Sequence, residues 1–221
     1  MKPRRRVGIL ISGRGSNMMA LVQAARAPDY PAEIVCVVSN RPTAAGLAWA
    51  REQGIAAHAV DHKAYATRED FEEALQAVLE DEGVELVACA GFMRLMTPGF
   101  VARWAGRMIN IHPSLLPLYP GLDTHARALA DGVRIAGCTV HFVTADMDAG
   151  PIIAQGAVPV VDGDTPDGLA ERILKVEHEI YPRALALVAS GAARLDGGRV
   201  KILTSVNQSA RLISPDEGRA S

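Results

Sequence analysis

The chain has 221 residues, of which 49% are hydrophobic and 22% are charged, and its formal net charge at pH 7 is −2. This balance is typical of a globular protein and excludes a mostly disordered chain. It also argues against the broad basic surface of a nucleic-acid-binding protein. The one basic cluster, Lys2–Arg6, directly precedes an apolar run and is interpreted as a solvated leader.

The first half of the chain alternates short apolar runs with amphipathic segments. The expected strands span residues 7–11, 34–38, 56–60 and 86–90, and the expected helices span 18–26, 44–53 and 68–82. Continuous apolar runs are typical of strands that are buried on both faces. Strand–helix alternation of this kind predicts a parallel sheet with right-handed crossovers.

The second half is less regular. A helix capped by Thr97-Pro98 should come first, followed by a strand at 107–111 that ends at His112-Pro113 and a helix at 124–130. An antiparallel pair of strands is expected at 137–144 and 151–161, and after it a long helix capped by Thr165-Pro166, which Pro182 should kink or divide. Two short strands joined at Asp196–Gly198 should follow the helix. Together the elements predict an α/β fold. The sheet should be Rossmann-like and mainly parallel, with helices on both faces and a C-terminal part that is partly antiparallel.

The domain organisation follows from the same pattern, which no internal repeat or low-complexity segment interrupts. We expect residues 1–206 to form a single domain, with halves at about 6–100 and about 101–206. Residues 207–221 are polar and are expected to form a flexible tail.

The cysteines and the apolar segments bear on location. Cys36, Cys89 and Cys138 all lie in apolar runs, and none belongs to a C-x-x-C pair. Such thiols are typical of buried, free cysteines in a reducing compartment. No apolar stretch reaches the ~18 residues of a membrane span, and the N-terminus has no signal-peptide cleavage pattern. We therefore expect a cytoplasmic protein.

The loop Gly13-Arg14-Gly15-Ser16-Asn17 follows a strand and opens a helix. Backbone N–H groups at a helix N-terminus favour a phosphate, and glycines let the backbone approach it closely. The dinucleotide fingerprint would need a small residue at Met18, and the lysine of a Walker A motif is absent. The loop therefore predicts a site for a single phosphate monoester, with a plain tight turn as the alternative.

Asn110 and His112 share one face of a strand, at the carboxyl end where open α/β sheets bind their ligands. An asparagine amide can donate to a developing oxyanion, and a histidine can transfer protons or stabilise the oxyanion as imidazolium. A carboxylate in the loop that holds Asp146 and Asp148 could support the His112 ring. The alternatives are a polar pair at a strand end and a turn that uses aspartate for backbone reasons.

The remaining histidines give weaker signals. His58 and His62 are four residues apart but lie in a strand and the following loop, so no metal site is expected there. His141 should point to the opposite face of its strand from its two neighbours, and His125 and His178 could be structural.

Several motifs of one family occur together in this chain. They are Ile11–Asn17 (ISGRGSN), Ala90–Arg94 (AGFMR), Asn110–Pro117 (NIHPSLLP), Tyr119–Gly121, Thr124-His125, Gly137–Val143 (GCTVHFV), Asp148–Pro151 and Glu177-His178. From about residue 6 to residue 200, the sequence closely resembles the phosphoribosylglycinamide formyltransferases, the folate-dependent enzymes of purine synthesis. The NIHPSLLP motif alone identifies the wider formyltransferase superfamily, and the phosphate loop selects this member.

The resemblance implies a Rossmann-like fold with a phosphate-binding N-terminal half and a folate-binding C-terminal half. It implies transfer of a formyl group from the cosubstrate 10-formyltetrahydrofolate to the amino group of glycinamide ribonucleotide, without a metal. The implied partners are these small molecules, with neither nucleic acid nor membrane, and the implied assembly is a monomer or a homodimer.

Roles of single residues also follow from the resemblance. The implied catalytic trio is Asn110, His112 and Asp148, and Glu177 should bind the substrate amine. The implied phosphate site comprises Gly13, Gly15, Ser16 and Asn17, and the implied folate-binding residues are Arg68, Phe92, Met93, Arg94, Leu95, Met96, Met147 and Asp148. Asp123 and Leu174 depart from the family pattern, where many relatives have a histidine and some a polar or basic residue, so those roles are not carried over.

Three other functions are weighed against this one. A formyltetrahydrofolate hydrolase would use a similar trio but carry an extra N-terminal domain, for which an expected first strand near Val7 leaves no room. A methionyl-tRNA formyltransferase would need a further RNA-binding domain and a basic surface. A ribonucleotide-binding module without catalysis would keep the phosphate loop but would not need the trio.

Overall fold

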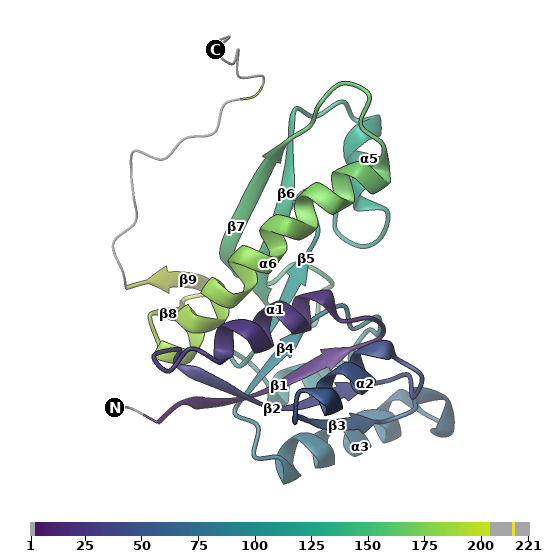
Figure 1. Cartoon of the computed structure of the whole chain (residues 1–221), viewed down its shortest axis with the longest axis vertical. Coiled ribbons are helices and arrows are strands. Elements are labelled where there is room, and N and C mark those ends of the chain that lie inside the picture. The colour runs from purple at the N-terminus through teal and green to yellow at the C-terminus, as the bar shows by residue number, and fades with distance from the viewer. Residues whose placement is uncertain (1–2, 204–213, 215–221) are drawn as a thin grey trace.

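A computed structural model describes residues 3–203 and residue 214 of the chain. In this part, a seven-stranded sheet has the order β3-β2-β1-β4-β5-β6-β7, and a separate pair, β8 and β9, forms a hairpin (Figure 1). The strands are β1 (Arg5–Ile11), β2 (Ala32–Ser39), β3 (Ala56–Ala59), β4 (Leu86–Cys89), β5 (Met108–His112), β6 (Ile135–Phe142), β7 (Ile152–Pro159), β8 (Ala193–Asp196) and β9 (Arg199–Ile202). Apart from residue 214, the expected tail at 207–221 lies outside the described residues.

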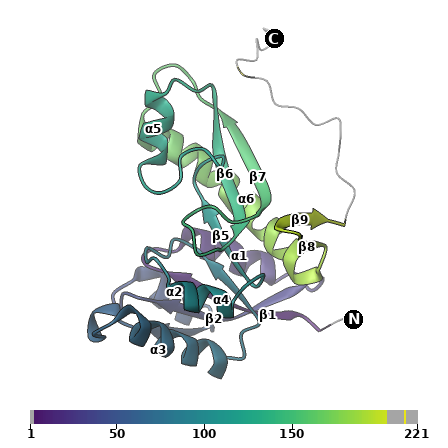
Figure 2. The same cartoon turned by 180° about the vertical axis from the view of Figure 1, so that it is seen from behind.

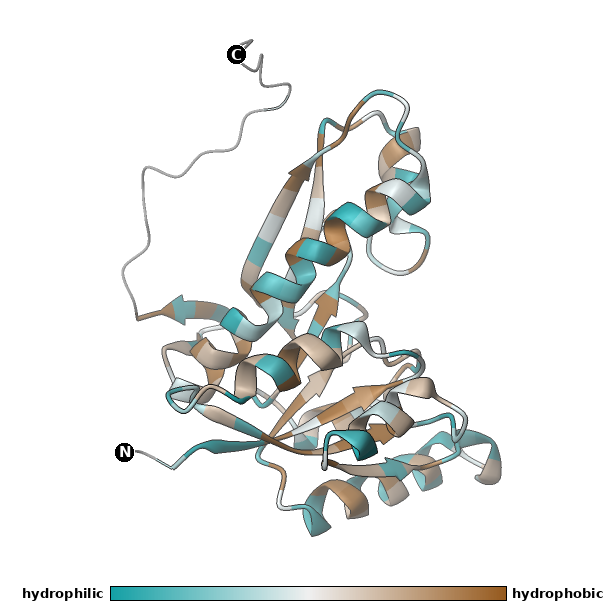
Figure 3. Ribbon diagram, in the orientation of Figure 1, coloured by the Kyte–Doolittle hydropathy of each residue, from teal (hydrophilic) through white to brown (hydrophobic). Residues whose placement is uncertain are grey.

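The five strands from β3 to β5 are parallel, which confirms the prediction from their apolar runs. Residues 7–11 of β1 and all of β4 are buried, and Figure 3 shows the hydrophobic colour concentrated on these central strands. The strand order reverses beside β1, because β2 and β4 flank it on opposite sides. Open α/β sheets bind ligands outside the carboxyl ends of the strands at such a switch point.

Helices cover both faces of the sheet, as predicted. The side chains of β1 alternate between two cores: Ile9 packs with α1, α2 and α6, whereas Leu10 packs with α3 and α4. The helices are α1 (Ser16–Ala25), α2 (Ala45–Glu52), α3 (Arg68–Asp81), α4 (Pro98–Arg103), α5 (Thr124–Ala130) and α6 (Pro166–Ser190), with a 3-10 turn, η1, at His62–Ala64.

The C-terminal part of the sheet is antiparallel, as predicted, since β6 pairs with both β5 and β7 in that sense. Figures 1 and 2 show β6 and β7 extending away from the parallel strands, with α5 and the first turns of α6 beside them. The two strands approach closely: a Cβ atom at Gly137 would lie 2.0 Å from the carbonyl oxygen of Gly156. The α/β fold with a partly antiparallel C-terminal part is therefore confirmed.

Two helices differ from their predicted forms. Helix α1 begins at Ser16, two residues earlier than predicted, because Gly15 adopts the left-handed conformation that ends the preceding loop. Helix α6 is continuous, so the alternative in which Pro182 divides it is wrong. Tyr181 and Leu185 on either side of the proline are fully buried, and this packing holds the helix together across the missing hydrogen bond.

Candidate active site

The carboxyl end of β5 carries Asn110 and His112 between the ends of β4 and β6. The Nδ1 atom of His112 lies 3.4 Å from Oδ2 of Asp148, and its Nε2 atom lies 2.9 Å from the carbonyl oxygen of Tyr119. Because a carbonyl can only accept, Nε2 carries the hydrogen of this bond. The other ring nitrogen, Nδ1, therefore faces the carboxylate, so His112 and Asp148, two members of the predicted trio, are neighbours.

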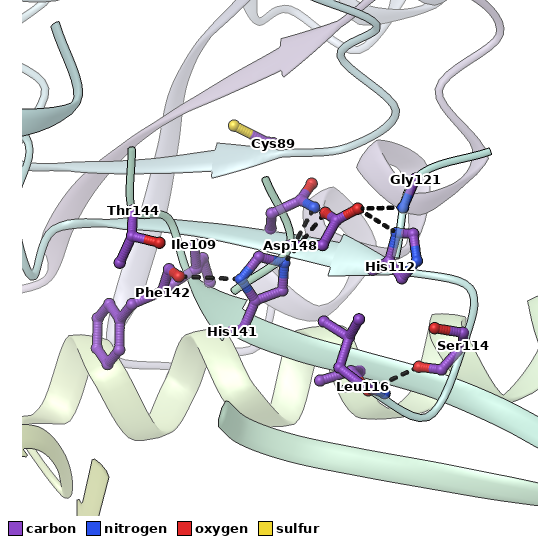
Figure 4. A network of polar contacts seen from close by, with 12 residues as sticks. Cys89, Ile109, His112, Ser114, Leu116, Gly121, His141, Phe142, Thr144 and Asp148 are labelled. Atoms are coloured by element: carbon purple, nitrogen blue, oxygen red, sulfur yellow. Dashed lines mark hydrogen bonds and ion pairs between the residues drawn. The ribbon is translucent and has the colours of Figure 1, made fainter. Parts of the chain in front are cut away.

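Asp148 lies in the loop between β6 and β7 and has a φ of 53°. Its Oδ2 atom accepts a hydrogen bond of 2.8 Å from the backbone N–H of Gly121, and Figure 4 shows its carboxylate between His112 and His141. The left-handed backbone suits aspartate better than most residues, so the turn interpretation of this loop holds as well. The turn and the contact with His112 thus occur together.

His141 also belongs to this cluster, although its sequence signal was weak. It pairs with Asn110 across the β5–β6 ladder, and its Nε2 atom lies 3.3 Å from Nδ2 of Asn110 and 3.8 Å from Oδ1 of Asp148. Its Nδ1–H donates to the carbonyl oxygen of Phe142 at 2.9 Å, and burial lowers the pKa of the ring. A neutral His141 therefore accepts one amide hydrogen of Asn110 and leaves the other directed elsewhere.

One cavity, of about 740 Å³, joins these groups to both predicted substrate regions. Its lining includes Asn17 and Glu177, the trio, Met147, and residues 92–96, which we call the folate-lining segment. Arg68 is the first residue of α3 and is exposed, and neither it nor Gly13, Gly15 and Ser16 lines this cavity. His125, for which the sequence allowed a structural role, does line the cavity, and its Nε2 atom is buried without a hydrogen-bond partner in the described part of the chain.

The predicted phosphate loop, residues 13–17, ends at the N-terminus of α1. Gly15 caps the helix with a φ of 72°, so Ser16 and Asn17 lie in the first turn, where backbone N–H groups have no partner within the helix. N–H groups in this position favour an anion, as the sequence predicted for this loop. His178 of α6 is a further candidate functional residue near this loop. Burial and the nearby Arg14 lower the pKa of its ring, and its Nε2 atom is buried and has no hydrogen-bond partner among the described residues.

Helix α2 packs directly on the phosphate loop at Gly46, and this contact gives a testable prediction. The backbone N–H of Gly46 donates to the carbonyl oxygen of Gly13. A Cβ atom added at Gly46 would lie 2.5 Å from the Ile11 side chain and 3.0 Å from that carbonyl oxygen. Gly46→Ala should therefore displace the loop and weaken binding of a phosphate monoester by about tenfold, measured calorimetrically, with a loss of about 1–3 kcal/mol in stability. Gly99→Ala, where a Cβ atom meets only Thr97 at 3.8 Å, is the matched control. Unchanged affinity in Gly46→Ala would contradict the loop's role.

Asn17 and Glu177 lie 160 positions apart in the chain but form one buried pair. The Nδ2 atom of Asn17 donates to Oε2 of Glu177 at 2.6 Å. Burial raises the pKa of Glu177, and the hydrogen bond from Asn17 opposes this shift. Oδ1 of Asn17 is buried and has no partner in the described residues, so the amide presents an acceptor. One of the donors expected to reach the phosphate is thus committed to Glu177.

The described residues contain neither a metal-ligand cluster nor a membrane-spanning helix. No group of three or more His, Cys, Asp or Glu side chains there is arranged to hold a metal ion. No helix of that part of the chain is long and apolar enough to cross a membrane.

Comparison with known proteins gives consistent matches. The family model described as formyl transferase matches residues 5–185. The chain is 50% identical over 196 residues to the trifunctional purine biosynthetic protein adenosine-3 of Bos taurus, covering 88% of this chain and 19% of that protein. It is 43% identical to the phosphoribosylglycinamide formyltransferase of Escherichia coli (strain K12), covering 87% of this chain and 94% of that protein. The chain thus spans about a fifth of its trifunctional relative.

Solved structures agree with the sequence matches. Glycinamide ribonucleotide transformylase 1 from Symbiobacterium toebii superposes with a TM-score of 0.89 at 46% identity, covering 92% of this chain and 96% of that one. The formyltetrahydrofolate deformylase from Burkholderia mallei superposes with a TM-score of 0.83 at 32% identity, covering 91% of this chain and 70% of that one. The chain therefore belongs to the formyl transferase family, among the phosphoribosylglycinamide formyltransferases.

Proposed function

We propose that the chain transfers the formyl group of 10-formyltetrahydrofolate to the amino group of glycinamide ribonucleotide. The observation that carries the proposal is the convergence of Asn110, His112 and Asp148 on one cavity that also reaches Glu177 and the folate-lining segment. The match to the Escherichia coli formyltransferase over nearly its whole length supports the same activity. Gly13, Gly15, Ser16 and Asn17 are proposed to bind the ribonucleotide phosphate, and Arg68 the folate tail.

The reaction needs an oxyanion site and a path for one proton. The substrate amine attacks the formyl carbon and forms a C–N bond, and the carbonyl oxygen becomes an oxyanion. The free amide hydrogen of Asn110 and a protonated His112 stabilise this oxyanion. As the bond from carbon to folate N10 breaks, the amine loses one proton and N10 gains one, with Asp148 and His112 moving it. No proton is gained or lost overall.

Glu177 is proposed to bind the amine that attacks. Its buried carboxylate, together with the free Oδ1 of Asn17, presents acceptors to an N–H donor. Glu177→Gln keeps an acceptor for Asn17 but removes the charge. We expect the KM for glycinamide ribonucleotide to rise by about tenfold or more, because hydrogen bonds to charged groups contribute about 1.5–3 kcal/mol. Steady-state kinetics measure this change, and an unaltered KM would contradict the assignment.

The stability of the same variant gives a second measurement. Burial raises the pKa of Glu177 above its ordinary value of 4.5. Between pH 4.5 and the raised pKa, the native state therefore binds more protons than the unfolded chain. The contribution of this group to stability is therefore present at low pH and lost as pH rises through the raised pKa. The Tm of Glu177→Gln relative to wild type should increase as pH rises above 4.5, and a constant difference would contradict the shift.

One assay separates this function from its alternatives. The protein is mixed with 10-formyltetrahydrofolate, with and without glycinamide ribonucleotide, and release of tetrahydrofolate is followed. Release that depends on the ribonucleotide supports the transferase. Release at the same rate without it would identify a hydrolase, as the likeness to a deformylase allows. Absence of release in both, with ribonucleotide binding intact, would identify a binding module.

The setting of the reaction is also a proposal. We infer that the protein acts on small molecules, binds neither nucleic acid nor membrane, and works as a monomer or a homodimer. The three cysteines are buried and free, which favours a reducing compartment such as the cytoplasm. 10-Formyltetrahydrofolate is a cosubstrate, and the proposed chemistry requires no metal.

A further inference from the structure

The folate-lining segment depends on a small number of anchors. Residues 92–96 have no regular secondary structure. At the far end, Thr97 donates its backbone N–H to the buried carboxylate of Glu72 at 2.7 Å, and its hydroxyl donates to the same carboxylate. At the near end, the backbone N–H of Met93 donates to the hydroxyl of Ser12 at 2.8 Å. These hydrogen bonds hold both ends of the segment, and between them Phe92 and Met96 pack against the core.

The near anchor belongs to the other substrate's region. Ser12 lies between β1 and the phosphate loop, and it is 3% exposed. Besides the bond from Met93, its own backbone N–H donates to the carbonyl oxygen of Gly91 at 3.1 Å. Ser12, the residue immediately before the phosphate loop, therefore makes two hydrogen bonds to residues 91 and 93 at the start of the folate-lining segment, at the switch point between β1 and β4.

A second buried residue orients the Ser12 hydroxyl. Ser12 Oγ donates its single hydrogen to Oδ1 of Asn40 at 2.5 Å, which leaves the oxygen lone pairs for Met93. Asn40 is 2% exposed, and Nδ1 of His62 donates to the backbone carbonyl oxygen of Asn40 at 2.9 Å. Because Ser12 and Asn40 are buried, loss of one partner leaves polar groups unsatisfied rather than hydrated.

We propose that Ser12 is a positioning residue that couples the two substrate sites. A phosphate bound at the loop restricts the backbone that follows Ser12, keeps the Ser12 hydroxyl facing the Met93 N–H, and so stabilises the folate-lining segment in the conformation seen here. By thermodynamic linkage, each ligand then raises the affinity for the other by the same factor. The inference rests on the proposed function, because its ligands are the ribonucleotide and the folate.

Calorimetry on the whole protein tests the coupling without turnover. Tetrahydrofolate carries no formyl group, so it can be titrated with and without saturating glycinamide ribonucleotide. In wild type the Kd for tetrahydrofolate should fall by about fivefold or more when the ribonucleotide is bound, and the reverse titration should give the same factor. In Ser12→Ala the factor should fall below about twofold.

Thr97→Val is the matched control, because it removes a hydroxyl from the opposite end of the same segment. It should weaken tetrahydrofolate binding but keep the wild-type coupling factor, because the hydroxyl of Thr97 bonds to Glu72 and Phe100 rather than to Ser12. If thermal melting shows that Ser12→Ala is unfolded, Asn40→Ala replaces it and should also reduce the factor, because the Ser12 hydroxyl loses its orienting acceptor.

The outcomes separate this inference from the proposed function. A wild type that binds both ligands without coupling overturns the inference alone, as does full coupling in Ser12→Ala or in a folded Asn40→Ala. If Thr97→Val lost as much coupling as Ser12→Ala, Ser12 would be one of several structural anchors of the segment, and the inference would also be overturned. Failure of wild type to bind either ligand would overturn both the inference and the proposed function.

Discussion

His112→Ala should lower kcat by about 1,000-fold while both substrates still bind. The variant removes the ring that is positioned between the Tyr119 carbonyl and Asp148, and with it both oxyanion stabilisation and proton transfer. These interactions form in the transition state, so their loss should appear in kcat. Single-turnover kinetics and calorimetric titration with glycinamide ribonucleotide measure the two quantities separately.

His58→Ala provides the matched control, since it removes a histidine from β3, where the ring pairs with Glu82 at 2.7 Å. Its kcat should stay within about twofold of wild type, because substitutions away from a site usually have small effects. A kcat for His112→Ala within tenfold of the wild-type value would exclude His112 from catalysis.

Asp148→Asn should lower kcat by about 100-fold to 1,000-fold with little change in stability. Asparagine tolerates the left-handed backbone at this position, where φ is 53°, and it can still accept the hydrogen bond from Gly121. What it lacks is the negative charge 3.4 Å from Nδ1 of His112. The loss should therefore fall on the chemical step, measured as kcat beside an unchanged Tm.

Two companion variants sharpen this test. Asp146→Asn changes an exposed carboxylate two residues away in the same loop and should leave kcat within about threefold of wild type. The double variant His112→Ala/Asp148→Asn should be no slower than His112→Ala alone, because the carboxylate acts through the ring. Additive losses would mean that Asp148 acts independently of His112.

The parallel part of the fold was predictable because its signal is local. Runs such as Val7–Ile11 are apolar at every position, as strands buried on both faces require, and their alternation with amphipathic helices leaves one type of sheet. The loop Gly13–Asn17 was predictable for the same reason, since glycines between a strand and a helix have a specific backbone use. The long helix beyond Pro166 was also predicted, but its passage through Pro182 depends on burial that periodicity does not report.

The site residues were predictable only where they belong to a recognisable sequence motif. Asn110, His112 and Asp148 could be named from their motifs, although their distances could not. His141 was missed as a site residue because its contact with Asn110 depends on the β5–β6 register, and a shift of one residue would turn the side chain to the other face. Had that register been known, the facing histidine would have been identified.

By itself, the sequence determined the order and type of the elements, the phosphate loop and the residue types that the chemistry needs, because these follow from spacing along the chain. Only the tertiary structure decided which groups meet: Asn17 with Glu177, His112 with the Tyr119 carbonyl, and Ser12 with Met93. Such pairs join residues from separate elements. Their geometry depends on strand register and helix packing, which no local pattern encodes.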